Sequence, residues 1–486
     1  MELVIFLLLI LDYLRGFSMF YFLTCILLCI QAYATTTGNQ TDIYSPILPP
    51  DSLPFRIRIE LDEWQLPAGL HSFSYGKHDG KWLLIGGRWN GLHDLDPNPD
   101  AFPPNQQNTT VYVVDPQFKT IVSRSLKDPD AELSQSQIDL LSVTSAPAHQ
   151  VCNTLYIVGG YGFDTAAGVF TTKDTLTAID VPGLMHWVLY GVGSARQCIR
   201  QVSDPFLQVT GGYLTKASSQ DPFLLIFGQN FPGFYQNVDS GFYTQQVRAL
   251  EILDNGRDLW IHPYPSAEPN PNYLRRDLNV VPIIKHKETG FERAYLALAG
   301  VFFPPDGGAW TIPVRIDPQG QSFMLNPECP DIFKQGINLY VCANTGFFSK
   351  QTKEMFLVLL GGITYLFPTE HGFKGDPELP FTNSITTVKI NEHGHFQQFL
   401  MDSTYPFMFS SLGTELLFGT SAEFIRADDL SIFSNGVIDL DEELSSPRLI
   451  GHIVGGIQSA LPNVTKTSDS AASPYIFRVI LEPRGL

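Results

Sequence analysis

The sequence predicts an all-β fold: a six-bladed β-propeller closed by an N-terminal strand that completes the last blade. The first observation is an apolar run ending in Gly-Gly, or a near variant, which recurs six times. The second is composition, because aromatic residues make up 12% and charged residues only 16%, and 40 glycines and 35 prolines supply turns for many short strands. The third is a strand-like segment near the N-terminus that supplies what the last repeat lacks.

The recurring run is the strongest of these signals. Its six copies are 82–87 (WLLIGG), 155–160 (LYIVGG), 224–229 (LLIFGQ), 295–300 (YLALAG), 356–362 (FLVLLGG) and 451–456 (GHIVGG). Each run is apolar on both faces, as expected for a strand enclosed between two neighbouring blades. The glycines allow a sharp turn and a close approach of backbones. Copies of one unit separated by variable insertions are typical of a propeller.

Further strands are predicted around each run, giving four per blade. Preceding strands are expected at 71–76, 146–152 and 279–285. Following strands are expected at 109–114, 176–181, 248–253, 311–316 and 385–390, and short aromatic fourth strands at 186–190, 259–262 and 396–400. The sixth run has one strand after it, at 475–481, so the missing strand is expected at 55–61 (FRIRIEL). Pairing the two ends would close the ring and hide both edges. The irregular stretch 407–425 is taken as the opening strand of blade six.

An aromatic residue also lies six or seven residues beyond several third strands, as Trp187, Trp260 and Phe396. With these residues and the glycine pairs, the chain resembles the kelch-repeat family from about residue 55 to residue 482. Gln229 and Val301 depart from the pattern, since they replace the second glycine of two repeats. The resemblance implies the fold rather than a function, because one propeller hosts many functions.

Residues 1–34 have the features of a signal peptide. An apolar run at 17–30 follows Arg15, and Ala32 and Ala34 form the small-x-small pattern that signal peptidase accepts. Cleavage is expected after Ala34. An uncleaved membrane anchor is the alternative, although the run is shorter than the ~20 residues that a span prefers.

The leader leaves a linker at 35–52 and a single propeller domain at 53–484. Translation from Met19 instead of Met1 would account for the additional apolar stretch at 3–11. The expected location is the periplasm, the cell surface or the medium.

The net charge of −18 excludes nucleic acid as an expected partner, because an acidic surface repels phosphate. Membrane contact is expected only through the leader, if it is retained. A monomer without a cofactor is expected. Cys152, Cys198, Cys329 and Cys342 remain after cleavage, so two disulfides are possible, Cys152–Cys198 and Cys329–Cys342, and four free thiols are the alternative. Their spacing does not resemble a zinc site.

The segments that leave the glycine pairs lie on one face of a kelch ring. They are estimated as 88–109, 161–173, 229–246, 301–309, 363–383 and 457–473. Long loops on a rigid scaffold are commonly functional, and these are rich in aromatic residues suited to a sugar or a protein. The candidate ligand-binding residues are Arg88, Trp89, Tyr161, Phe231, Tyr235, Phe302, Tyr365, Arg275 and His371. Alternatively, the aromatic side chains bury one another over the ring.

No catalytic or metal-binding constellation is recognised. Phosphate loops, G-x-S-x-G and H-E-x-x-H are absent, and the acidic run 94–100 lacks the glycine and glutamate of a calcium loop. Exported sialic-acid mutarotases look like six-bladed kelch rings of similar size, but no specific motif matches. The favoured hypothesis is therefore a binding module for a carbohydrate or protein. The alternatives are a carbohydrate-modifying enzyme, of the mutarotase, epimerase or lyase kind, at the channel mouth, and a purely structural ring.

Overall fold

The computed structural model describes residues 44–93, 101–235, 241–287, 290–298, 300–303, 308–464 and 466–485. The chain divides into two units, Met1–Pro46 and Ile47–Leu486, and the second contains all the strands described below. The predicted leader at 1–34 and the first part of the linker lie outside the described residues. Within the described ranges, no helix is long and apolar enough to cross a membrane.

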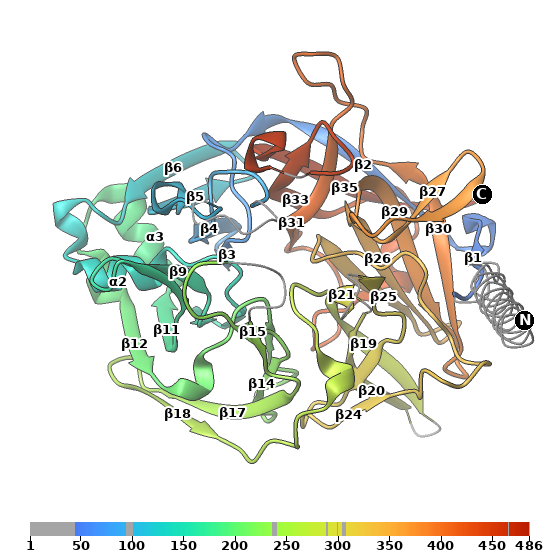
Figure 1. Cartoon of the computed structure of the whole chain (residues 1–486), viewed down its shortest axis with the longest axis horizontal. Coiled ribbons are helices and arrows are strands. Elements are labelled where there is room, and N and C mark those ends of the chain that lie inside the picture. Colours follow the sequence, from blue (N-terminus) through green and yellow to red (C-terminus); the bar gives the residue numbers. More distant parts are fainter. Residues whose placement is uncertain are drawn as a thin grey trace, which may run out of the picture. The chain divides into compact units, whose positions relative to one another are not determined.

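The second unit is an all-β propeller (Figure 1). Its first three sheets are antiparallel and four-stranded, each with its strands in chain order from the centre of the ring outwards, apart from short hairpins that are inserted between them. They consist of β3 (Ser74–His78), β4 (Lys81–Ile85), β5 (Thr110–Asp115) and β6 (Thr120–Ser125); β7 (Ala148–Val151), β8 (Thr154–Val158), β11 (Thr175–Asp180) and β12 (Ile199–Ser203); and β13 (Tyr213–Thr215), β14 (Phe223–Ile226), β17 (Val247–Asp254) and β18 (Leu259–Pro263).

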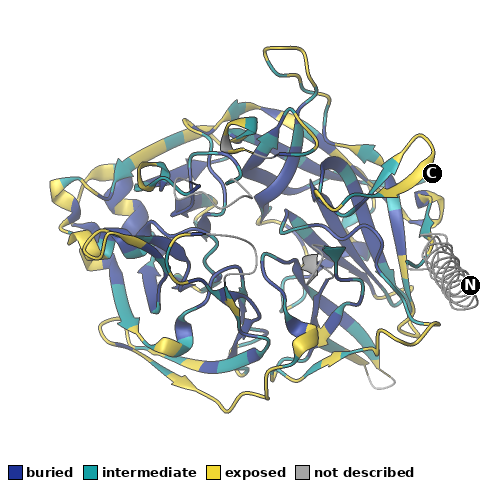
Figure 2. Cartoon of the chain, viewed as in Figure 1, coloured by how far each residue is buried: buried dark blue, intermediate teal, exposed yellow. Residues whose placement is uncertain are grey.

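The remaining large sheets complete the arrangement. They consist of β19 (Val280–Lys287), β20 (Gly290–Ala297), β23 (Val314–Ile316) and β24 (Ser322–Met324); β25 (Asn344–Ser349), β26 (Glu354–Ile363), β29 (Phe381–Ile390) and β30 (Phe396–Thr404), with β1 (Ile47–Leu48) and β32 (Ile438–Asp439) at the edges; and β31 (Leu417–Arg426), β33 (Arg448–Ser459), β35 (Tyr475–Pro483) and β2 (Phe55–Gln65), with β34 (Ser470–Ala472) beside β33. Figure 2 shows buried residues along the sheets and exposed residues on the outer strands and connections.

Short elements fill the connections. The hairpins are β9 (Tyr161–Asp164) with β10 (Val169–Thr172), β15 (Gln229–Asn230) with β16 (Phe242–Tyr243), β21 (Val301–Phe303) with β22 (Gly308–Ala309), and β27 (Leu366–Thr369) with β28 (Gly372–Gly375). The helices described are α2 (Gln135–Leu141), α3 (Val181–Tyr190) and α4 (Leu440–Glu443).

Five blades of a propeller are recognised in this structure, not the six that the sequence predicts. The last two sheets depart from a plain four-stranded meander. The fifth carries a parallel strand at each edge, β1 beside β30 and β32 beside β25. The last is completed from the other end of the chain and extended by β34.

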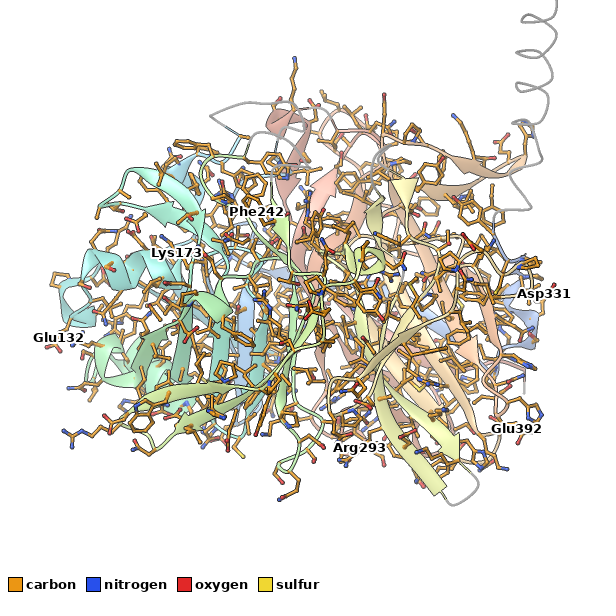
Figure 3. The ribbon with its side chains drawn as sticks, turned by 60° about the horizontal axis from the view of Figure 1, so that its bottom comes forward. Glu132, Lys173, Phe242, Arg293, Asp331 and Glu392 are labelled. Carbon is orange, nitrogen blue, oxygen red and sulfur yellow. The ribbon has the colours of Figure 1, made fainter. Side chains whose placement is uncertain are left out.

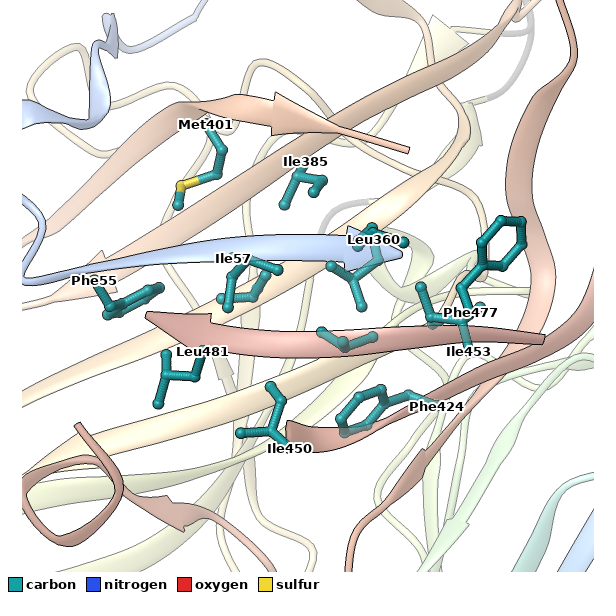
Figure 4. Close-up of a cluster of buried hydrophobic side chains, with 14 of the residues drawn as sticks. Phe55, Ile57, Leu360, Ile385, Met401, Phe424, Ile450, Ile453, Phe477 and Leu481 are labelled. Atoms are coloured by element: carbon teal, nitrogen blue, oxygen red, sulfur yellow. The ribbon is translucent and has the colours of Figure 1, made fainter. Parts of the chain in front are cut away.

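The N-terminal strand completes the last sheet, as predicted. β2 pairs antiparallel with β35, from Phe55 opposite Pro483 to Leu61 opposite Phe477. Phe55, Ile57 and Ile59 are buried, and the residues between them are exposed. The buried side chains pack against β35 and the neighbouring sheet in one large apolar cluster (Figure 4).

A closed ring of backbone hydrogen bonds joins residues that lie shortly before the innermost strands or, in the last sheet, within β31. The N–H groups of Ser72, Ser145, Gly211, Asp277, Val341 and Ser421 each donate to the carbonyl of the ring member before them in the chain, and Ser72 donates to Ser421, with N···O distances of 2.7–3.2 Å. Four of these residues are not glycine yet have φ between 46° and 53°. That conformation costs roughly 1–3 kcal/mol per residue and persists because the surrounding sheets impose it.

One local prediction is wrong. Residues 181–190 form α3 rather than a strand at 186–190, and the fourth strand of that sheet is β12. Pro182 starts the helix, Gly191 ends it in the left-handed conformation with φ 65°, and Trp187 is fully buried. Of the two alternatives left open for Cys152, Cys198, Cys329 and Cys342, the structure has the four free thiols and neither of the possible disulfides.

Candidate functional site

A cavity of about 110 Å³ lies over the ring of hydrogen bonds. Four ring members, Ser72, Ser145, Asp277 and Ser421, contribute to its lining. Its walls come from two positions that recur around the propeller. One set precedes a ring member (His71, Thr144, Thr210, Arg276 and Tyr340), and the other follows a glycine or glycine pair (Arg88, Tyr161, Gln229, Ile363 and Ile457). The repeat itself therefore gathers these side chains at the centre.

The connections that follow the second strands share a face with the cavity, because each innermost strand begins, and each second strand ends, at the level of the ring. Gly87, for example, donates its N–H to the carbonyl of Val143, two residues before a ring member. Figure 3 shows Lys173 and Phe242, which lie on such connections, at the opposite side of the propeller from Arg293 and Glu392.

Arg88 is a buried cation in the cavity wall with an exposed fraction of 2%. Its Nε donates to Asn90 Oδ1 at 2.9 Å and its Nη2 to the Pro103 carbonyl at 3.0 Å, whereas Nη1 has no hydrogen-bond partner. Among the described residues, no carboxylate lies within ion-pair distance of it. Burial lowers the pKa of Arg88 to about 10, so the guanidinium remains charged at neutral pH.

The charge of Arg276, in contrast, is balanced by a neighbouring carboxylate. Its Nε lies 3.4 Å from Asp277 Oδ2, and its Nη1 donates to Gln229 Oε1 at 3.1 Å and to the Tyr243 hydroxyl at 2.9 Å. The hydroxyl of Tyr340 shares a hydrogen bond with the Asp277 carboxylate. Burial raises the pKa of Asp277 against the opposing effect of Arg276, and it raises the pKa of Tyr340 further above its usual value.

His71 contributes a neutral imidazole. Burial lowers its pKa to about 3, and the charge of Arg88 acts in the same direction. Nδ1 lies 2.9 Å from the Ser72 hydroxyl, and Nε2 has no hydrogen-bond partner. A buried neutral imidazole nitrogen can donate to or accept from a ligand hydroxyl.

Aromatic side chains form one wall of the cavity. Phe231 and Tyr235 are stacked with ring centroids 5.1 Å apart, and the ring of Tyr161 meets Phe231 edge-on at 5.7 Å. Phe102 packs against Tyr161 and lies 5.0 Å from the Arg88 guanidinium. These side chains largely bury one another in a small separate cluster. The loops therefore form a lined cavity here rather than an open aromatic surface.

The structure brings together only some of the predicted site residues. Arg88, Tyr161, Phe231 and Tyr235 line the cavity. Trp89 packs into a different apolar cluster. The side chain of Phe302 lies outside what is described.

Tyr365 and His371 lie beside and on the β27–β28 hairpin, away from the lining. Tyr365 is half-buried against Gly375 and His371 is exposed at the turn.

Of the two adjacent arginines, the predicted Arg275 does not line the cavity. It is buried away from the cavity, where Nη2 donates to the Ile312 carbonyl at 2.7 Å and the guanidinium lies over the Trp310 ring. Neighbouring residues of an extended segment point to opposite sides, so Arg276 faces the cavity instead. His71, Asp277 and Tyr340 were also missed, although their common place before or at the start of an innermost strand is visible in the sequence.

The described residues contain no group of three or more His, Cys, Asp or Glu side chains arranged to hold a metal ion.

Comparisons with known proteins assign no family to this chain. No protein-family model matches the chain, and no curated protein matches it. A solved structure titled "Structure of YjhT" is similar over 85% of this chain and 96% of that chain, with 10% sequence identity and a TM-score of 0.43. Membership of the kelch family is therefore not shown.

Proposed function

We propose that the protein is a binding propeller whose central cavity takes a small acidic sugar. The observation that carries this proposal is Arg88, a buried cation that lines the cavity, with no hydrogen-bond partner at Nη1 and no carboxylate within ion-pair distance among the residues that the structure describes. An unpaired buried charge is costly, and the carboxylate of a ligand would offset that cost. A carboxylate oxygen at Nη1 would make a charge-assisted hydrogen bond, among the stronger kinds in proteins.

The rest of the lining supports a sugar as the carrier of that acidic group. Thr144, Thr210, Gln229 and His71 offer donors and acceptors for hydroxyl groups. The stacked Phe231 and Tyr235 offer apolar surface for the face of a sugar ring. The small volume of the cavity favours a monosaccharide over a polymer.

A second function is favoured by the Asp277–Tyr340 pair. A carboxyl and a phenol that share a hydrogen bond in the ligand cavity could exchange protons with a bound sugar. The protein would then be a carbohydrate-modifying enzyme of the mutarotase or epimerase kind. Exchange between the anomers or epimers of a bound acidic sugar, followed by NMR, separates this reading from pure binding, with Asp277→Asn and Tyr340→Phe as the diagnostic variants.

We also propose that the propeller is kelch-like with six blades and that the protein is exported. Six sheets of four or more strands among the described residues, and the six members of the hydrogen-bond ring, support the count. The apolar run and alanines of the predicted leader support export. Glycans are the expected partners, with a protein bound by the same loops as the second choice.

A thermal-shift comparison tests the binding proposal. Residues 35–486 would be heated with glucuronate and glucose, galacturonate and galactose, and N-acetylneuraminate and N-acetylmannosamine. We expect stabilisation by at least one acid and not by its neutral partner, worth ~2.7 kcal/mol at a hundredfold excess over the dissociation constant. Arg88→Gln should abolish the shift, and Arg257→Gln, at an exposed arginine, should retain it. Equal shifts with acid and neutral sugars, or none with any acid, would count against the proposal.

A further inference from the structure

The connection between β30 and β31 forms a projecting apolar hairpin at residues 406–416. It is the orange loop that extends beyond the sheets in Figure 1. Phe407, Phe409 and Leu412 are 74%, 61% and 91% exposed. Elsewhere in the described chain, exposed apolar side chains occur at most in close pairs, such as Tyr190 with Val192 and Phe323 with Leu325, and no other run of six residues holds three. Three exposed apolar side chains within six residues of one projecting hairpin indicate an interaction surface.

The hairpin is an ordered element, not a loose loop. Leu416 N–H donates to the Met408 carbonyl and Ser410 N–H to the Thr414 carbonyl, both at 2.8 Å. Gly413 N–H closes the turn on the Ser410 carbonyl at 2.9 Å. The Ser410 hydroxyl also accepts from the Leu412 and Thr414 N–H groups. These polar backbone groups are thus paired internally, as required of any segment that leaves water.

The base of the hairpin is anchored while its tip is presented to the outside. Met408 and Leu416 pack on the large apolar cluster between the last two sheets. Phe407 and Phe409 flank Met408 and point the other way, since extended residues alternate. The exposed side chains therefore stand on a fixed base, which lowers the entropy lost when they bind.

The charge of the hairpin narrows the choice of partner. Residues 403–414 contain no charged side chain, and the nearest charges on either side, Asp402 and Glu415, are both acidic. The whole chain is also acidic, with a net charge of −18. Acidic residues repel anionic lipid, so electrostatic attraction to an anionic membrane surface does not explain this element.

The area of the tip argues against a protein partner held by this element alone. A fully exposed Phe offers ~150–250 Å², so the three side chains together offer ~400 Å². A stable protein interface buries ~800 Å² on each partner. Insertion of a few apolar side chains into the interfacial region of a bilayer requires no such area, because affinity there grows with each buried apolar group.

We propose that this hairpin inserts its tip into the surface of a zwitterionic lipid bilayer. The protein would thereby be held at a membrane without a spanning segment. None of the hairpin residues lines the sugar cavity, and this inference does not depend on the proposed function.

Flotation with phosphatidylcholine vesicles tests the proposal on residues 35–486. The wild-type chain should float with the vesicles, equally at low and high salt. The triple variant Phe407→Ser, Phe409→Ser, Leu412→Ser should partition at least tenfold less. Phe118→Ser, which removes an equally exposed phenylalanine on another turn, should behave like the wild type. The Leu412→Trp variant should show blue-shifted fluorescence with vesicles even if the triple variant fails to fold.

Several results would overturn the proposal. One is a wild-type protein that fails to bind phosphatidylcholine vesicles or binds only when phosphatidylglycerol is present. Others are a triple variant that binds as well as the wild type, and a Leu412→Trp fluorescence spectrum that vesicles leave unchanged. A wild-type dimer in light scattering that the triple variant abolishes would instead assign the hairpin to a second copy of the chain.

Discussion

Replacing Arg88 by methionine should remove a buried charge at little cost to stability. Burial lowers the pKa of Arg88 from 12.5 to about 10, which corresponds to ~3 kcal/mol against the charged form in the folded state. The substitution also loses two hydrogen bonds, to Asn90 and to the Pro103 carbonyl, worth ~1.5 kcal/mol each for a charged donor. The two effects nearly cancel, so the free energy of unfolding should change by less than ~1 kcal/mol.

Arg276→Met supplies the matched comparison in the same cavity. Arg276 is paired with Asp277, so its removal leaves a buried carboxylate without its counter-ion. Breaking such a pair costs ~3–5 kcal/mol. Both variants would be unfolded with urea and the midpoints compared at equal slope. A loss of ~3 kcal/mol or more in Arg88→Met would refute the reasoning, because Arg88 would then be a structural cation rather than one kept for a ligand.

Three further predictions follow from the structure. Burial raises the pKa of Glu423 to about 8, so the folded chain holds a proton that the unfolded chain releases above about 4.5. The free energy of unfolding should therefore fall as the pH rises from 5 to 8. Urea denaturation at pH 6 and pH 9 measures this fall, and Glu423→Gln should make it smaller. Equal wild-type stability at the two pH values would contradict this. In residues 35–486, a thiol reagent should titrate two cysteines in the native state, the exposed Cys152 and Cys329, and all four after denaturation. Fewer than four after denaturation without reductant would indicate a disulfide. Phe55→Ala should lower the free energy of unfolding by ~3–5 kcal/mol, because the ring is fully buried where the two ends of the chain pair, and a loss below ~1 kcal/mol would show that this closure matters little.

The sequence predicts the fold well because the fold is repetitive. The apolar runs that end in glycine correspond to the second strands, and the alternation in 55–61 correctly predicts the strand that pairs with β35. Gly87 shows why glycine recurs there. Its φ is 84°, and a Cβ would lie 2.4 Å from the His71 carbonyl oxygen, so no other residue fits without a shift of backbone.

Where prediction failed, tertiary context decided. Residues 186–190 were placed in a strand by their aromatic content, but the apolar segment around Trp187 packs as a helix against the first two sheets. The irregular edges of the last two sheets come from strands β1 and β32, which are only two residues long and carry no pattern. The number of blades depends on such edges.

The site was only partly predictable, for a geometric reason. The sequence predicts ligand-binding residues mainly on the long loops, whereas half of the recurring wall positions, such as His71 and Tyr340, immediately precede a member of the hydrogen-bond ring. A difference of one residue also decides which of Arg275 and Arg276 faces the cavity, and no pattern in two adjacent arginines reveals that register. Comparing equivalent positions across the repeats would have found these residues.

The central claim is that Arg88 binds the acidic group of a ligand. A crystal structure of residues 35–486 soaked with the acidic sugar that gives the largest thermal shift tests it most directly. We expect a carboxylate oxygen ~2.7–2.9 Å from Arg88 Nη1, with the sugar ring beside Phe231 and Tyr235. A sugar bound with its carboxylate in solvent, or bound outside this cavity, would contradict the account.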